Sequence, residues 1–130
     1  MSASSLPNAA RVVLAGVRIV NGTVSLFAPA TFARRIGVEP ETNGPALYAL
    51  RLFGVRTILI GTQLLSRNPE VRADALRLAT RIHMSDTIAA TVAATTRQLP
   101  PKGAKAAMIT SSINTVLAMV ARRTLPPSRR

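Results

Sequence analysis

The sequence predicts an all-α protein: a four-helix membrane bundle with up-down topology and both termini on the cytoplasmic side. Two features of the composition support this fold class. Apolar residues make up 48% of the chain and its mean hydropathy is +0.26, yet its net charge is +12. This combination is unusual in a soluble domain of this size. In a membrane the two features are compatible, because apolar faces meet lipid while arginines collect near anionic head groups.

The 130 residues fit one domain. We expect a flexible tail at 1–8, a single four-helix domain at 9–123 and a basic tail at 124–130. The first helix is predicted over 9–27 and ends before Pro29. An irregular connector is expected over 32–43, where glycine and proline interrupt the chain.

The second helix is predicted over 45–66, because Pro45 suits the first turn of a helix. Its length of about 33 Å matches a hydrocarbon layer of roughly 30 Å. The third helix is expected to run from Pro69 to about Arg97, with an amphipathic, interfacial first half and a second half whose single charge is Asp86.

The fourth helix is predicted over 104–123, with an uncharged core at 106–120 and basic side chains on both flanks that can reach the two interfaces. Under the positive-inside rule, the end of the bundle with more lysines and arginines lies on the cytoplasmic side of the membrane. The inner side would hold Arg11, Arg67, Arg72, Arg77, Arg81, Arg122, Arg123, Arg129 and Arg130, and the outer side Arg34, Arg35, Arg97, Lys102 and Lys105.

The second helix carries Arg51, Gly54, Arg56 and Gly61 in the pattern Arg-x-x-Gly-x-Arg-x-x-x-x-Gly, and a lone Asp86 follows in the third helix. With this motif the chain resembles a group of uncharacterised small four-helix integral membrane proteins of high-GC bacteria, a domain of unknown function. The resemblance covers most of the chain. It implies a fold and a membrane location, and it implies no activity.

A buried polar cluster is predicted from helix depth. At 1.5 Å per residue from the inner end, Arg18 lies about 13 Å deep, Arg56 about 15 Å and Asp86 about 8 Å, and His83 lies one turn before Asp86. The cluster has three interpretations: a salt bridge that sets helix register, a pocket for an anionic head group, or a proton relay through His83 and Asp86. Alternatively, Asp86 is an N-cap that starts a new helix at Thr87. Arg51 is expected to extend toward the outer interface.

Small residues on two helices predict close packing, because small side chains let helix backbones approach each other in lipid. A homodimer face is the alternative interpretation. The residues concerned are Gly54, Thr57 and Gly61 on the second helix, and Ala107, Ser111, Asn114 and Ala118 on the fourth.

No catalytic constellation is found, and neither a metal site nor a cofactor is expected, since the chain has no cysteine and one histidine. An enzyme is therefore not the leading interpretation. We expect a small multi-pass protein of the inner (plasma) membrane, with an accessory or structural role and contacts to the bilayer and its anionic head groups. Another membrane protein or a second copy of the chain is a further candidate partner.

Two other function classes remain open. The charge of +12 is compatible with a soluble, basic, helical nucleic-acid-binding protein, although aromatic residues make up only 3% of the chain and stacking platforms are therefore scarce. The second alternative is a small membrane enzyme or transporter subunit that uses the pocket of Arg18, Arg56 and Asp86.

Overall fold

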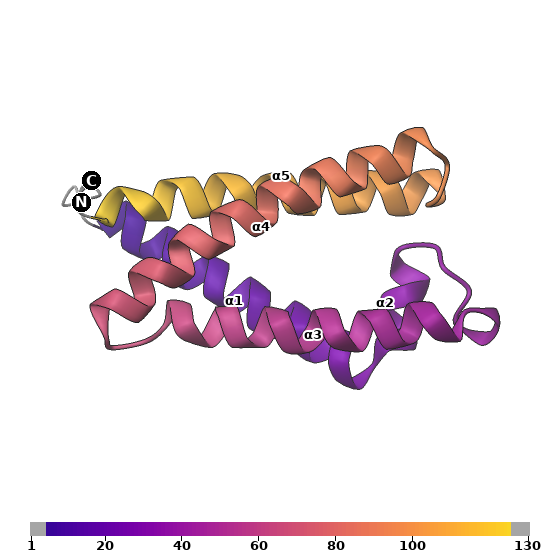
Figure 1. Cartoon of the computed structure of the whole chain (residues 1–130), viewed down its shortest axis with the longest axis horizontal. Coiled ribbons are helices and arrows are strands. Elements are labelled where there is room, and N and C mark those ends of the chain that lie inside the picture. The colour runs from indigo at the N-terminus through magenta and orange to yellow at the C-terminus, as the bar shows by residue number, and fades with distance from the viewer. Residues whose placement is uncertain (1–4, 126–130) are drawn as a thin grey trace.

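The structure is a computed structural model that describes residues 5–125, and its regular elements are helices. The elements are α1 (Ser5–Phe27), α2 (Pro29–Arg35), the 3₁₀ turn η1 (Pro40–Thr42), α3 (Gly44–Leu64), α4 (Pro69–Thr95), α5 (Pro101–Ala121) and the 3₁₀ turn η2 (Arg122–Thr124). No strand occurs between residues 5 and 125. The all-helical prediction is confirmed, and the long helices α1, α3, α4 and α5 alternate in direction (Figure 1).

Three helices begin at other residues than predicted, and each of them has a proline in its first turn. Helix α1 begins at Ser5, inside the expected flexible tail, with Pro7 in its first turn. Pro29, expected only to end the first helix, also begins α2, which extends into the expected connector at 32–43. Helix α5 begins at Pro101 instead of residue 104. The first four N–H groups of a helix have no intrahelical acceptor, so a proline there loses no hydrogen bond.

The expected basic tail at 124–130 begins differently as well. Thr124 still belongs to η2, and Leu125 packs against the hydrophobic core. Residues 126–130, with Arg129 and Arg130, lie outside the described part of the chain, as do residues 1–4.

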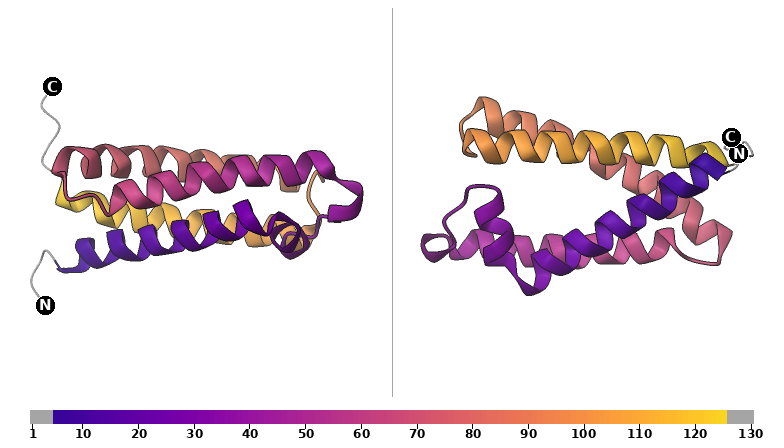
Figure 2. Two further views of the ribbon diagram at one scale, coloured as in Figure 1. Left: turned by 90° about the horizontal axis from the view of Figure 1, so that it is seen from below. Right: turned by 180° about the vertical axis from the view of Figure 1, so that it is seen from behind.

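The helices form two pairs that diverge toward the end of the molecule where α2 lies. Helices α4 and α5 form one hairpin, and α3 lies beside the second half of α1 (Figure 1). Helix α1 runs diagonally from the C-terminal end of α5 across to α3, as the view from behind shows (Figure 2). The pairs therefore meet near Ser5 and Leu125 and separate toward the other end.

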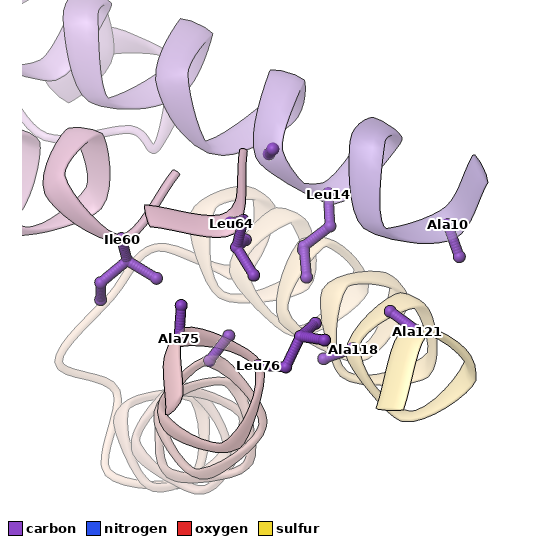
Figure 3. Packing of buried hydrophobic residues seen from close by; sticks show 10 residues of the cluster. Ala10, Leu14, Ile60, Leu64, Ala75, Leu76, Ala118 and Ala121 are labelled. Atoms are coloured by element: carbon purple, nitrogen blue, oxygen red, sulfur yellow. The ribbon is translucent and has the colours of Figure 1, made fainter. Parts of the chain in front are cut away.

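The hydrophobic core lies where the pairs meet (Figure 3). Its largest fully buried side chains are Leu14, Leu64 and Leu76, which come from α1, α3 and α4. Most of the surrounding core is alanine, so the backbones approach closely. The cluster comprises Ala10, Leu14, Ala15, Ile60, Leu64, Ala75, Leu76, Ala79, Ala118 and Ala121.

Glycines set the crossing of α1 and α3. A Cβ atom on Gly54 would lie 2.7 Å from the carbonyl oxygen of Gly22, and one on Gly22 would lie 2.9 Å from the carbonyl oxygen of Gly54. A Cβ atom on Gly61 would lie 2.8 Å from a side-chain carbon of Ile19. At these three positions only glycine leaves room for the neighbouring helix.

Two arginines also join α1 and α3 by donating to carbonyl groups near the C-terminus of the other helix. Arg11 of α1 donates to the carbonyl oxygen of Leu64, near the C-terminus of α3. Arg51 of α3 donates to the carbonyl oxygen of Leu26 at 2.6 Å, near the C-terminus of α1. The last carbonyls of a helix lack intrahelical donors and carry partial negative charge, so a guanidinium suits each position. Arg51, which was expected to extend toward the outer interface, is exposed and binds the end of α1 that was assigned to that side.

The distribution of side chains is reversed relative to a soluble bundle. Within residues 5–125, nine of the thirteen buried hydrophobic residues are alanines, whereas nineteen large hydrophobic side chains are exposed along the four long helices. Arg18, Thr57, His83 and Asn114 are buried. Large aliphatic residues usually fill the interior of a soluble domain, and arginine is almost never fully buried there without a partner.

Two helical segments are long and apolar enough to cross a membrane. They are Ser5–Phe27, with a mean hydropathy of 1.4, and Pro101–Thr124, with 1.3. Only 33% and 22% of these segments are buried, unlike the core helix of a soluble protein. Helices α3 and α4 are long enough but not apolar enough to pass the same test. Two arginines lower the mean hydropathy of α3, and the first half of α4 is charged.

We expect Gly54→Ala to destabilise the fold by about 1–3 kcal/mol, because the new methyl group meets backbone atoms that cannot move independently. Gly16→Ala is the matched control in α1, since a Cβ there meets nothing within 4 Å. It should be neutral or stabilising by up to about 1 kcal/mol through helix propensity. Chemical unfolding followed by circular dichroism compares the two, and equal effects would contradict a glycine-dependent crossing.

Candidate polar site between the helix pairs

The structure brings the four side chains of the expected cluster together in the angle between the helix pairs. Arg18 extends from α1, Arg56 from α3, and His83 and Asp86 from α4. Arg18 is 2% exposed and His83 is 4% exposed, so both are interior. Arg56 is less buried than predicted, with 48% of its side chain exposed.

The two buried members of the cluster, Arg18 and His83, are joined by a hydrogen bond. Nη1 of Arg18 contacts Nε2 of His83. A guanidinium has only donors, so Nε2 is the acceptor, and the imidazole is the neutral tautomer with its proton on Nδ1. That Nδ1 faces Oδ2 of Asp86 at 3.9 Å. Arg18 is therefore satisfied at one nitrogen by an uncharged partner.

The outer half of the cluster is the ion pair of Arg56 and Asp86, whose nearest atoms lie 3.7 Å apart. The guanidinium of Arg56 also stands over the ring of Phe53, 5.6 Å from its centroid. Helix α4 continues unbroken from Pro69 to Thr95. Asp86 is therefore in the middle of a helix, and the alternative in which it caps a new helix at Thr87 is wrong.

A cavity of about 550 Å³ adjoins this cluster. Arg18, Thr57 and His83 are among the buried polar residues that line it, and Phe32 and Phe53 contribute aromatic rings to its wall. The two rings pack in a tilted arrangement, with centroids 6.0 Å apart. Exposed residues from several helices stand at its rim, so the cavity is open to the surroundings. They are Arg35, Ala89, Ala106 and Thr110.

The small residues predicted to pack helices divide into two groups. Gly54 and Gly61 contact α1, and Ala118 lies in the core. The others line the cavity: Thr57, Ala107, Ser111 and Asn114. The helical spacing identified an inward-facing row correctly. It did not show that the helix pairs separate along part of that row.

Two groups of residues were missed by sequence reasoning. Gly22, which contacts Gly54, belongs to a row of inward positions on α1 with Ala15, Arg18 and Ser25, and this helical spacing is visible in the sequence. Arg35 and Phe32 lie on α2, in the segment expected to be irregular. Without that helix, no sequence signal brings them to the cavity.

The cluster carries an excess of positive charge. Arg56 is paired with Asp86, whereas Arg18 and Arg35 make no ion pair with any described residue. No group of three or more potential metal ligands occurs among residues 5–125. The chemistry available here is therefore the binding of an anionic or hydrogen-bond-accepting group.

No protein-family model matches the chain, and neither a curated protein nor a solved structure matches it. The resemblance in the second helix accordingly stays a prediction.

A double-mutant cycle with Arg56→Gln and Asp86→Asn should give a coupling energy of about 1 kcal/mol, because the pair joins α3 to α4. The pair of Asp74 and Arg77 is a local control, three residues apart in α4 with 2.8 Å between their nearest atoms. Its cycle should give only about 0.2–0.5 kcal/mol. Unfolding free energies measure both cycles, and no coupling at Arg56 would exclude a role of this pair in helix register.

Proposed function

We propose that the chain is a small integral membrane protein whose four long helices form an up-down bundle in the inner membrane, with an accessory or structural role. The single observation that carries this proposal is the reversed distribution of side chains. Exposed large hydrophobic residues, such as Leu52 on α3, Ile88 on α4 and Val116 on α5, occur on helices whose interior faces are alanine, glycine and polar residues. Small residues between helices and large apolar residues facing outward are typical of packing in lipid.

The distribution of basic residues supports both the bilayer and an orientation within it. The end of the bundle near Ser5 and Leu125 carries Arg11, Arg67, Arg72, Arg77, Arg122 and Arg123, and the opposite end carries Arg34, Arg35, Arg97, Lys102 and Lys105. Basic residues at both ends contact anionic head groups, and the larger group favours the cytoplasmic side. The arrangement is compatible with the resemblance to small four-helix membrane proteins of high-GC bacteria.

Membrane fractionation of tagged protein tests the proposal directly. We expect the protein to stay with membranes through high-salt and alkaline washes and to be released only by detergent, because apolar burial in lipid does not depend on ionic strength. Release by salt alone would contradict the proposal. In that case electrostatic binding to an acidic partner such as nucleic acid would explain the charge of +12.

The topology is testable because the chain contains no cysteine. We expect Thr42→Cys, in the connection between α2 and α3, to react with a membrane-impermeant maleimide in intact bacterial cells. Arg67→Cys, in the connection between α3 and α4, should react only after permeabilisation, since one helix separates the two positions. Labelling of both positions from the same side would contradict an up-down bundle across the bilayer.

A further inference from the structure

The cavity of about 550 Å³ between the helix pairs combines a polar, positively charged floor with apolar walls. Its volume lies within the range of roughly 300–1,000 Å³ that is common for small-molecule sites. Buried Arg18 and Thr57 belong to the polar part, and Phe32, Phe53 and Leu99 to the apolar part. Such a division fits a ligand with a polar head and an aliphatic body.

Two residues that line this cavity each carry a buried polar atom without a partner. These atoms are Nε of Arg18 and Oγ1 of Thr57, on residues that are 2% and 3% exposed. An unsatisfied buried donor costs about 1–3 kcal/mol, more if it is charged. Both groups can donate a hydrogen bond, so an oxygen-rich head group is a suitable acceptor for each of them.

The charge of the cavity indicates the sign of that head group. Asp86 is the one carboxylate among the described residues that line the cavity, and it lies near both Arg56, with which it pairs, and Arg18. Arg18 itself donates to a neutral imidazole, so two arginines share one carboxylate. Arg35 at the rim adds a further positive charge. The cavity therefore keeps a net positive charge, and a carboxylate or phosphate is the group that a guanidinium binds best.

The apolar walls indicate what carries the head group. Phe32 and Phe53 form one wall, and alanines of α4 and α5 form the opposite one, including Ala90 and Ala107. These surfaces offer no further charged partner to a purely hydrophilic anion. A flexible aliphatic chain gains about 0.8 kcal/mol for each methylene that it buries.

We propose that this cavity binds an anionic amphiphile, with its phosphate or carboxylate on Arg18 and Thr57 and the first part of an aliphatic chain between the phenylalanine and alanine walls. The bilayer as the source of this ligand rests on the proposed function; the chemistry of the cavity does not. Inorganic phosphate shares the head-group chemistry but lacks the chain, and phosphatidylcholine has the chains but no net charge.

Native mass spectrometry of the full chain in a neutral detergent tests this proposal. The probes are phosphatidylglycerol, oleate, phosphatidylcholine and inorganic phosphate, each added separately. We expect one bound molecule of phosphatidylglycerol or of oleate, and the preferred one identifies the natural head group as phosphate or carboxylate. Equal retention of phosphatidylcholine, or displacement of the amphiphile by equimolar inorganic phosphate, would overturn the proposal.

Matched variants separate the cavity from the basic surface. Arg18→Gln should weaken binding at least about tenfold, because a charged hydrogen-bond partner is lost. Arg81→Gln removes one exposed charge outside the cavity and should change binding by less than about twofold. If the two variants weaken binding equally, binding is a general effect of positive charge and the proposal fails.

A second pair of variants leaves every charge in place. Ala107→Leu fills the cavity and should reduce binding about tenfold or more, whereas Ser112→Leu, on the exposed face of the same helix, should leave it unchanged. Wild-type binding by both Arg18→Gln and Ala107→Leu would overturn the proposal. If salt alone releases the protein from membranes but oleate still binds through Arg18, the membrane assignment fails and the cavity assignment stands.

Discussion

The close contact of α1 with α3 at Gly22 and Gly54 determines most of the architecture. Because neither helix has a Cβ atom at the contact, the backbones meet there and α1 crosses α3 at an angle. Helix α1 then leaves α3 and reaches the hairpin of α4 and α5 at the opposite end, where Leu14 joins the core (Figures 2 and 3). Two helix pairs held at an angle leave a space on the side where they diverge. The cavity is thus a consequence of how α1 crosses the bundle.

The same geometry explains how a buried arginine is tolerated. Arg18 lies on α1 just before the crossing, where α1 passes from one helix pair to the other, so its side chain reaches His83 across the interior. An uncharged residue at this position would leave the cavity without its buried cation. A carboxylate beside it would neutralise the site, but the nearest acid, Asp86, is already paired with Arg56 nearer the surface. Arg18 and Arg56 therefore share one carboxylate, and the positive charge left over is the arrangement expected of a binding site for an anion.

The sequence predicted the helical class and the members of the polar cluster, because both depend on regular geometry. A rise of 1.5 Å per residue and alternating helix directions are enough to put Arg18, Arg56 and Asp86 at similar depths. It did not predict α2, and it offered a pocket only as one of three interpretations of the cluster. Pro29 was interpreted as the end of the first helix, although it also begins α2. The helical spacing of Ala107, Ser111 and Asn114 would be the same whether these residues packed against another helix or lined a cavity. The difference depends on the angle between the helices, which was set by Gly22, a residue that local pattern alone did not distinguish.

The exposed aliphatic residues and the polar interior have a common physical origin. In lipid, burial of a leucine between helices gains little over its exposure to acyl chains, so packing depends on close backbone contact and on polar bonds. This fold uses both, through Gly54 against α1 and through Arg11 and Arg51 on the helix ends. Interior volume is then available for polar groups without loss of a large aliphatic core. At the proposed location in a bilayer, the aliphatic chain of a bound lipid would continue into the hydrocarbon that surrounds the bundle, so a pocket for its head group would cost little energy.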